Sequence, residues 1–152
     1  MTALLPDLRA FGRFLTREPI AADDLVQDTV VRALAAQHSF EPGTNLKAWL
    51  FTIQRNAFFE QNRRRQRENV LLSEQAADAV SVTPEANARG EVSDLQRMLW
   101  TLPTLLREAL VLVGAQELTY EEAADICDVP VGTMKARVSR ARTQLAAALA
   151  GD

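Results

Sequence analysis

The chain has 152 residues, and 47% of them are hydrophobic, which is enough for one globular domain or two small ones with packed cores. Its 17 basic and 20 acidic residues give a formal net charge of −3, so total charge argues weakly against nucleic-acid binding and the distribution of charge must decide. Cys127 is the only cysteine and His38 the only histidine, which excludes an internal disulfide and disfavours a structural zinc centre. We therefore expect no metal and no other cofactor.

The sequence carries no sign of a membrane segment. No apolar run approaches the length that a bilayer crossing needs, and the N-terminus lacks the basic start and apolar core of a signal peptide. We expect a cytoplasmic protein without a membrane partner.

Three helices are predicted in the first part of the chain. The first runs to about Leu15, the second from Asp23 to about Gln37, and the third from Leu46 into the run "NRRRQR". At about 100° per residue, the second helix separates into two faces. Its packing face is expected to hold Val26, Val30, Ala33 and Leu34, and its outer face Asp24, Gln27, Asp28 and Val31.

The stretch from residue 69 to residue 91 is small, mildly acidic and without a sustained period, which is typical of a flexible linker. Four further helices are predicted after it, in tight succession, and no strand pattern is present. We expect an all-α fold of two small helical domains, residues 1–68 and 92–152, joined by that linker, with a helix-turn-helix in the second.

The segment "TYEEAADICDVPVGTMKARVSRAR" predicts this helix-turn-helix. Thr119 and Glu122 form a capping box, and Pro130 ends the first helix. Opposite the packing face of the second helix lie Thr133, Ala136, Ser139, Arg140 and Thr143. They are flanked by Lys135, Arg137 and Arg142, which make this face basic. Such a helix suits the DNA major groove, because Lys and Arg neutralise phosphates and donate to base edges. The alternative is the solvated side of an amphipathic helix in a bundle.

The long helix from Leu46 carries a second basic face. Arg55, Asn56, Phe59 and Arg63 line up opposite its core stripe, and Arg64 and Arg65 continue the charge. Basic groups can follow a nucleic-acid backbone while an aromatic or amide group contacts an unpaired base. The alternative is a buried Phe59 and a solvated basic helix end.

Acidic residues mark the outer face of the second helix. No histidine or third carboxylate accompanies Asp24 and Asp28, so catalysis is disfavoured and we expect no enzyme activity. The face can be merely solvated, or it can dock a basic protein surface.

These three segments, in this order, resemble the extracytoplasmic-function (ECF) sigma factors of bacterial RNA polymerase, members of the sigma-70 family. "ADDLVQDTVVRAL" resembles their polymerase-clamp-binding helix, and "FEPGTNLKAWLFTIQRNAFFEQNRRRQR" resembles the segment that melts and binds the −10 promoter element. The stretch from "LPTLLREAL" to "VSRAR" resembles their −35-binding domain. The resemblance implies a sigma factor that directs core polymerase to promoters and helps to open the −10 region.

The resemblance also implies roles for particular positions. Polymerase contacts, to the β′ clamp, are implied for Asp24, Leu25, Val26, Gln27 and Asp28. Contacts to the −10 element are implied for Phe40, Arg55, Asn56, Phe59, Arg63, Arg64 and Arg65. Contacts to the −35 element are implied for Thr133, Lys135, Ala136, Arg137, Ser139, Arg140 and Arg142. Ala136 stands where relatives often have a small hydroxyl residue, so a base contact is least expected there.

The wording "PGTNLKAWLFTI" is most similar to the general-stress-response subgroup of alphaproteobacteria. The expected partners are core RNA polymerase (β′ clamp and β flap), promoter DNA and a small anti-sigma factor that holds the protein inactive. Two alternatives stay open: a sigma-like mimic that binds only the anti-sigma protein, and a plain helix-turn-helix repressor. A mimic would have no need of "NRRRQR" or of a basic recognition helix.

Overall fold

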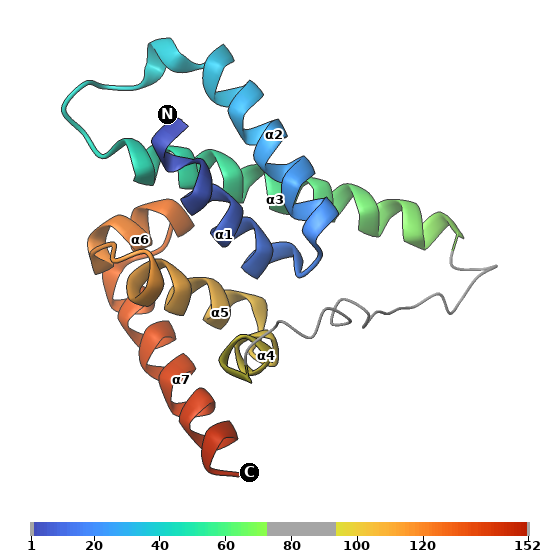
Figure 1. Cartoon of the computed structure of the whole chain (residues 1–152), viewed down its shortest axis with the longest axis vertical. Coiled ribbons are helices and arrows are strands. Elements are labelled where there is room, and N and C mark those ends of the chain that lie inside the picture. The colour runs from blue at the N-terminus through green and yellow to red at the C-terminus, as the bar shows by residue number, and fades with distance from the viewer. Residues whose placement is uncertain (1, 73–93, 152) are drawn as a thin grey trace.

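The computed structural model describes residues 2–72 and 94–151, which form two groups of helices with no strand among them (Figure 1). The first group contains η1 (Thr2–Leu4), α1 (Leu5–Thr16), α2 (Pro19–Ala35), η2 (Gln37–Ser39) and α3 (Leu46–Leu72). The second contains α4 (Asp94–Trp100), α5 (Thr104–Leu110), the π-helical turn η4 (Val111–Ala115), α6 (Tyr120–Cys127) and α7 (Val131–Ala150). The all-α prediction is confirmed.

Helix α2 begins four residues before the predicted start at Asp23. Pro19 occupies its first turn, where a missing N–H costs nothing, and the Glu18 carboxylate accepts a hydrogen bond of 2.7 Å from the Ala21 N–H. Arg17 lies in the left-handed region, with φ of 65°, and reverses the chain between α1 and α2. The prediction took "REPIAADD" for an interruption, but Glu18 and Pro19 act as a helix start.

Helix α3 begins where the sequence predicted and continues further. The Asn45 side chain accepts a hydrogen bond of 3.2 Å from the Ala48 N–H and caps the first turn. The helix runs to Leu72, so residues 69–72 of the expected linker are helical, while residues 73–91 of that linker lie outside the described residues. The C-terminal turns of α3 project past the other helices in Figure 1.

The helix-turn-helix forms as predicted from α6 and α7. The Thr119 hydroxyl accepts a hydrogen bond of 3.0 Å from the Glu122 N–H, and the Glu122 carboxylate accepts one of 3.0 Å from the Thr119 N–H. Asp128 then adopts the left-handed conformation, with φ of 57°, and Pro130 precedes the first residue of α7. The capping box and the turn together fix the direction in which α7 leaves α6.

The two groups of helices share one apolar core. Leu50 and Phe51 of the first group belong to the same cluster of buried side chains as Leu112, Ile126 and Met134 of the second. Helix α3 packs against α6, and α1 packs against α5 (Figure 1). The sequence left compact and extended arrangements open, and the structure has the compact one.

Across the described ranges, no helix combines the length and the apolar character that crossing a bilayer requires.

Candidate nucleic-acid interface

The basic face of α7 is open to solvent. Met134, Val138 and Ala141 point into the core, and the opposite side of the helix carries the predicted DNA-contacting residues. Five of these are exposed: Lys135, Ala136, Ser139, Arg140 and Arg142. A helix held by its apolar side and offering short and basic side chains on the other can enter a major groove without rearrangement.

Two predicted residues of α7 are less accessible. Thr133 is half-buried in the first turn, and Arg137 is half-buried beside α6. One guanidinium nitrogen of Arg137, Nη1, is buried and has no hydrogen-bond partner among the residues that the structure describes. Lys135 is exposed but lies with its Nζ 5.7 Å from the centre of the Tyr120 ring. Arg140 and Arg142 are exposed and, among the described residues, make no such ring contact.

The second basic face, on α3, is divided in two. Arg63, Arg64 and Arg65 are exposed on the projecting part of the helix, and Asn56 is exposed as well. Phe59 is half-buried, with its ring against that of Phe58 at 5.0 Å between centroids. This part of the face is accessible for a nucleic-acid strand.

The other part of the α3 face is covered by the second group of helices. Arg55 donates two hydrogen bonds to the Glu108 carboxylate of α5, from Nε at 2.8 Å and from Nη2 at 2.9 Å. The Arg55 side chain is only 14% exposed and the Glu108 side chain is fully buried. Burial lowers the pKa of Arg55, but the hydrogen bond and charge of Glu108 outweigh it and leave this pKa above its ordinary value, so the guanidinium stays charged. Arg55 cannot contact a strand in this arrangement.

Phe40 lies in the loop between η2 and α3. Its ring contacts that of Trp49 with 5.2 Å between centroids, and both side chains are half-buried. The loop therefore holds an aromatic pair beside the first turn of α3, where a flat base could stack. Trp49 was not among the residues predicted to contact the −10 element.

The structure corrects the predicted polymerase contacts on α2. Leu25 is fully buried and Val26 nearly so, because both lie on the side of the helix that packs against the core. Asp28 is half-buried and accepts hydrogen bonds of 3.0 Å from Arg32 and from Gln61. Of the five residues, only Asp24 and Gln27 are fully open to a partner.

Exposed apolar side chains extend this surface; Val31 was predicted on the outer face, whereas Ile20 and Leu34 were not. Ile20, Val31 and Leu34 are 69%, 64% and 53% exposed, and they share one side of the helix with Asp24 and Gln27. We call these five residues the α2 outer face. Leu34 was predicted to pack, and that was wrong. The spacing of 20, 24, 27, 31 and 34 was the available signal, because it follows one helical stripe.

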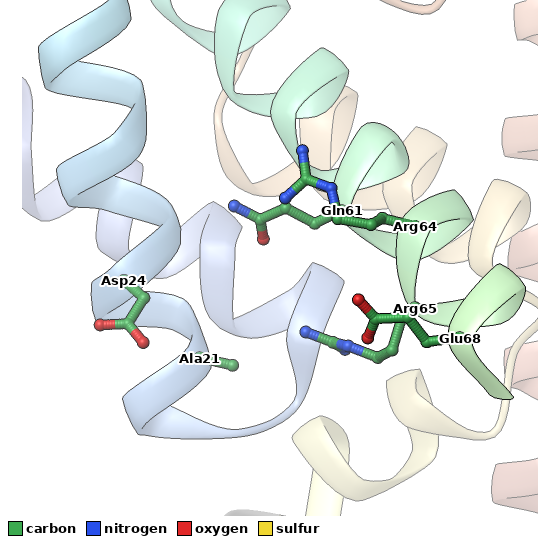
Figure 2. A pocket seen from close by; sticks show the side chains of 6 residues that line it. All are labelled: Ala21, Asp24, Gln61, Arg64, Arg65 and Glu68. Atoms are coloured by element: carbon green, nitrogen blue, oxygen red, sulfur yellow. The ribbon is translucent and has the colours of Figure 1, made fainter. Parts of the chain in front are cut away.

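The α2 outer face adjoins the exposed basic part of α3. An open hollow of about 370 Å³ lies between the two helices, lined by Ala21, Asp24, Gln61, Arg64, Arg65 and Glu68 (Figure 2). Its walls carry both signs of charge. A protein partner on α2 and a nucleic-acid strand on α3 would therefore be neighbours.

Two family models match separate parts of the chain. The family model described as Sigma-70 region 2 matches residues 1–68, and the one described as Sigma-70, region 4 matches residues 93–145. The first includes α2 and most of α3, and the second includes the helix-turn-helix.

Individual relatives cover almost the whole chain. The ECF RNA polymerase sigma factor EcfG of Rhodopseudomonas palustris is 47% identical over 150 residues, which are 99% of this chain and 83% of the relative. The ECF RNA polymerase sigma factor SigC of Mycobacterium tuberculosis is 34% identical over 129 residues, which are 84% of this chain and 69% of the relative.

Among solved structures, the sigma factor RpoE from Bartonella quintana, crystallised with the anti-sigma factor NepR, is 44% identical with a TM-score of 0.83. The match covers 99% of this chain and 94% of that one, so both groups of helices and their mutual arrangement are shared. The chain therefore belongs to the extracytoplasmic-function sigma factors of the sigma-70 family, with its resemblance to the alphaproteobacterial general-stress-response members confirmed.

Proposed function

We propose that the chain docks on core RNA polymerase through the α2 outer face and contacts promoter DNA through α3 and α7. The observation that carries this proposal is the placement of three separate exposed surfaces on one chain whose two halves match sigma regions 2 and 4. The role is non-catalytic, and it places the protein in the cytoplasm with polymerase and chromosome.

The chemistry of the α2 outer face suits a protein partner. Exposed Ile20, Val31 and Leu34 supply apolar area, while Asp24 adds a negative charge near the centre. Apolar contacts with a charged group among them favour a partner surface with apolar and basic side chains. We assign this surface to the β′ clamp, and a second polymerase contact to the β flap through the C-terminal half.

The DNA contacts divide between duplex and single strand. Arg140 and Arg142 of α7 meet the −35 duplex, with Arg142 nearer phosphate. Arg63, Arg64 and Arg65 hold the backbone of the opened −10 strand, while Phe40, Asn56 and Phe59 contact its bases. Arg55 joins them once the C-terminal half has moved away.

An anti-sigma factor is the third proposed partner. The RpoE relative shares the compact arrangement of this chain and was crystallised with an anti-sigma factor. A compact chain covers part of its own DNA-binding face, so a partner that stabilises this arrangement would keep the protein inactive. A stress signal would release it.

Reconstituted run-off transcription tests the proposal. Purified core polymerase with this chain, on a library of alphaproteobacterial stress promoters, is expected to give promoter-specific transcripts that neither component gives alone. Failure on every promoter would contradict the sigma role, and tight binding to an anti-sigma protein without transcription would favour the mimic. Polymerase-independent binding to paired duplex half-sites would favour the repressor.

A paired substitution tests the docking surface. Val31→Glu with Leu34→Glu places two charges on the α2 outer face and is expected to weaken core-polymerase binding by about thirtyfold, the size of an interface hot spot. Arg9→Ala with Arg13→Ala changes the net charge by the same amount at exposed positions of α1 and should leave binding intact. Equal binding by both variants would exclude this surface.

A further inference from the structure

The two halves of the chain meet through a row of polar contacts along α3. The Arg55 guanidinium binds Glu108 of α5, the Lys47 ammonium donates to the Gln116 carbonyl at 2.9 Å, and the Asn45 amide donates to the Glu122 carboxylate at 2.8 Å. In these contacts the first half supplies the donors and the second half supplies the acceptors. Two of these acceptors, Glu108 and Glu122, are carboxylates, which present anionic oxygens as a phosphate backbone does.

The Arg55–Glu108 pair stands out because it is buried. Glu108 is fully covered, and Arg55 is nearly so. Two charge-assisted hydrogen bonds, which together form one bidentate interaction, hold them. Removing one member of a buried pair leaves an uncompensated charge, whereas separating the two halves returns both charges to water. A chain that loses one member therefore favours the separated arrangement.

Arg55 is also a member of the basic face that we assign to the opened −10 strand. Phe59, one turn further along that face, has its ring centre 4.6 Å from the Arg55 guanidinium. The same guanidinium cannot bind Glu108 and a strand phosphate together, because packing against α5 leaves the paired Arg55 side chain only 14% exposed. Closure of the chain and strand capture by Arg55 are mutually exclusive.

We propose that the Arg55–Glu108 pair is an autoinhibitory contact: it holds the free chain closed and keeps Arg55 from DNA until another partner separates the halves. The idea that Arg55 binds DNA rests on the proposed function, whereas the closed state does not. With this contact in place, the free chain should bind promoter DNA poorly despite its basic faces. The RpoE relative has this arrangement together with an anti-sigma factor, and here the chain supplies a closing contact of its own.

Small-angle X-ray scattering of the full chain tests closure. A compact chain of 152 residues has a radius of gyration of about 15 Å, and we expect the wild-type value to lie near this size. Glu108→Gln keeps the shape but removes the charge, so we expect the radius to rise by several ångströms. Glu121→Gln removes a charge from the exposed surface of α6 and should leave the radius unchanged.

A variant with the two charges exchanged distinguishes loss of the contact from loss of the fold. Arg55→Glu with Glu108→Arg restores opposite charges, and we expect its radius to return toward the wild-type value. Circular dichroism should show the same helix content in every variant. An unchanged radius in Glu108→Gln, with helices intact, would overturn the proposal whether or not the chain supports transcription.

A DNA-binding measurement tests the competition. The probe is a fluorescein-labelled single-stranded 12-mer of random sequence. We expect Glu108→Gln to bind it about tenfold more tightly than wild type, with a salt slope steeper by about 0.7, as for one added phosphate contact. Adding Arg55→Ala should abolish the gain. An open Glu108→Gln chain with unchanged DNA affinity would refute the masking of Arg55 while leaving the closing contact in place.

Discussion

The basic faces of α3 and α7 are built from similar residues but differ in access. On α7, Arg140 and Arg142 extend into solvent from a helix that is held by its apolar side alone. On α3, Arg55 is covered and bound to Glu108, while Arg63 and Arg64 on the same helix are exposed. Composition therefore identifies a candidate DNA face, but its availability depends on which other element packs against it.

The largest expected difference between the covered and the exposed parts of the molecule is in the rate at which a thiol reacts. The covered thiol is that of Cys127, near the Arg55–Glu108 pair. Burial, assisted by the Glu108 carboxylate, raises the pKa of the Cys127 thiol on α6 to about 12. At pH 8 its reaction with a disulfide reagent should be on the order of a thousandfold slower than that of an ordinary cysteine, because only the thiolate reacts. The rate should rise with pH up to about 12, where the thiolate becomes the main form.

The comparator for Cys127 lies on α7. Cys127→Ser with Ser139→Cys places the only thiol on the exposed face, and that thiol should react at an ordinary rate. Glu108→Gln should move the Cys127 rate toward this value. The wild-type chain and the Cys127→Ser, Ser139→Cys variant are compared at the same pH. Equal reaction rates in the two would show that the surroundings of Cys127 are open to solvent.

The next largest effect concerns the exposed α7 face. Arg140→Ala should weaken holoenzyme binding to a −35 duplex by about tenfold to a hundredfold and relax the preference at one base pair, as expected for loss of a base contact. Arg142→Ala should weaken all sequences alike and reduce the salt slope by about 0.9, as for loss of one phosphate contact. Fluorescence anisotropy over a set of −35 variants measures both. If both variants lost affinity for the same −35 sequences to the same extent, the assignment of a base contact to Arg140 and a phosphate contact to Arg142 would be contradicted.

The smallest expected effect concerns α6, which packs against both α3 and α7. Thr119→Ala removes the cap of α6, whose Glu122 also reaches Asn45 at the start of α3, and should lower the free energy of unfolding by about 1 kcal/mol. Thr143→Ala, on the exposed side of α7, loses only a hydroxyl contact within that helix and should be nearly neutral. Thermal denaturation followed by circular dichroism compares them. A neutral Thr119→Ala would show that the capping box does not stabilise the fold.

Local signals in the sequence predicted most of the fold. Thr119 with Glu122, Asn45 before α3, and the apolar spacing in α1 and α7 each act within one helix, so a short stretch of sequence contains them. The start of α2 could have been found in the same way, because Glu18 followed by Pro19 is a known helix beginning. The segment was misjudged because its polar residues were taken for a break.

The sites were predicted less completely than the fold. The resemblance implied contacts for five consecutive residues of α2. Consecutive residues of a helix point in different directions, so Leu25 and Val26 are buried while Asp24 and Gln27 are exposed. Ile20 and Leu34 complete that face together with Val31, which periodicity had placed there, but the resemblance selected none of the three. The pairing of Arg55 with Glu108 joins residues 53 positions apart, and periodicity within a helix carries no information on such a contact. The charged pair Arg107 and Glu108 within the apolar run "LLREALVLV" was the only hint.

Strand opening at the −10 element tests the central claim most directly. Permanganate reactivity of thymines should appear in that region with core polymerase and wild-type chain, and Arg63→Ala with Arg64→Ala should reduce it by about tenfold. Arg9→Ala with Arg13→Ala, the same loss of charge on α1, should retain it. Reactivity that is equal in both variants, or that appears without the chain, would contradict the assignment of the α3 face to the opened strand.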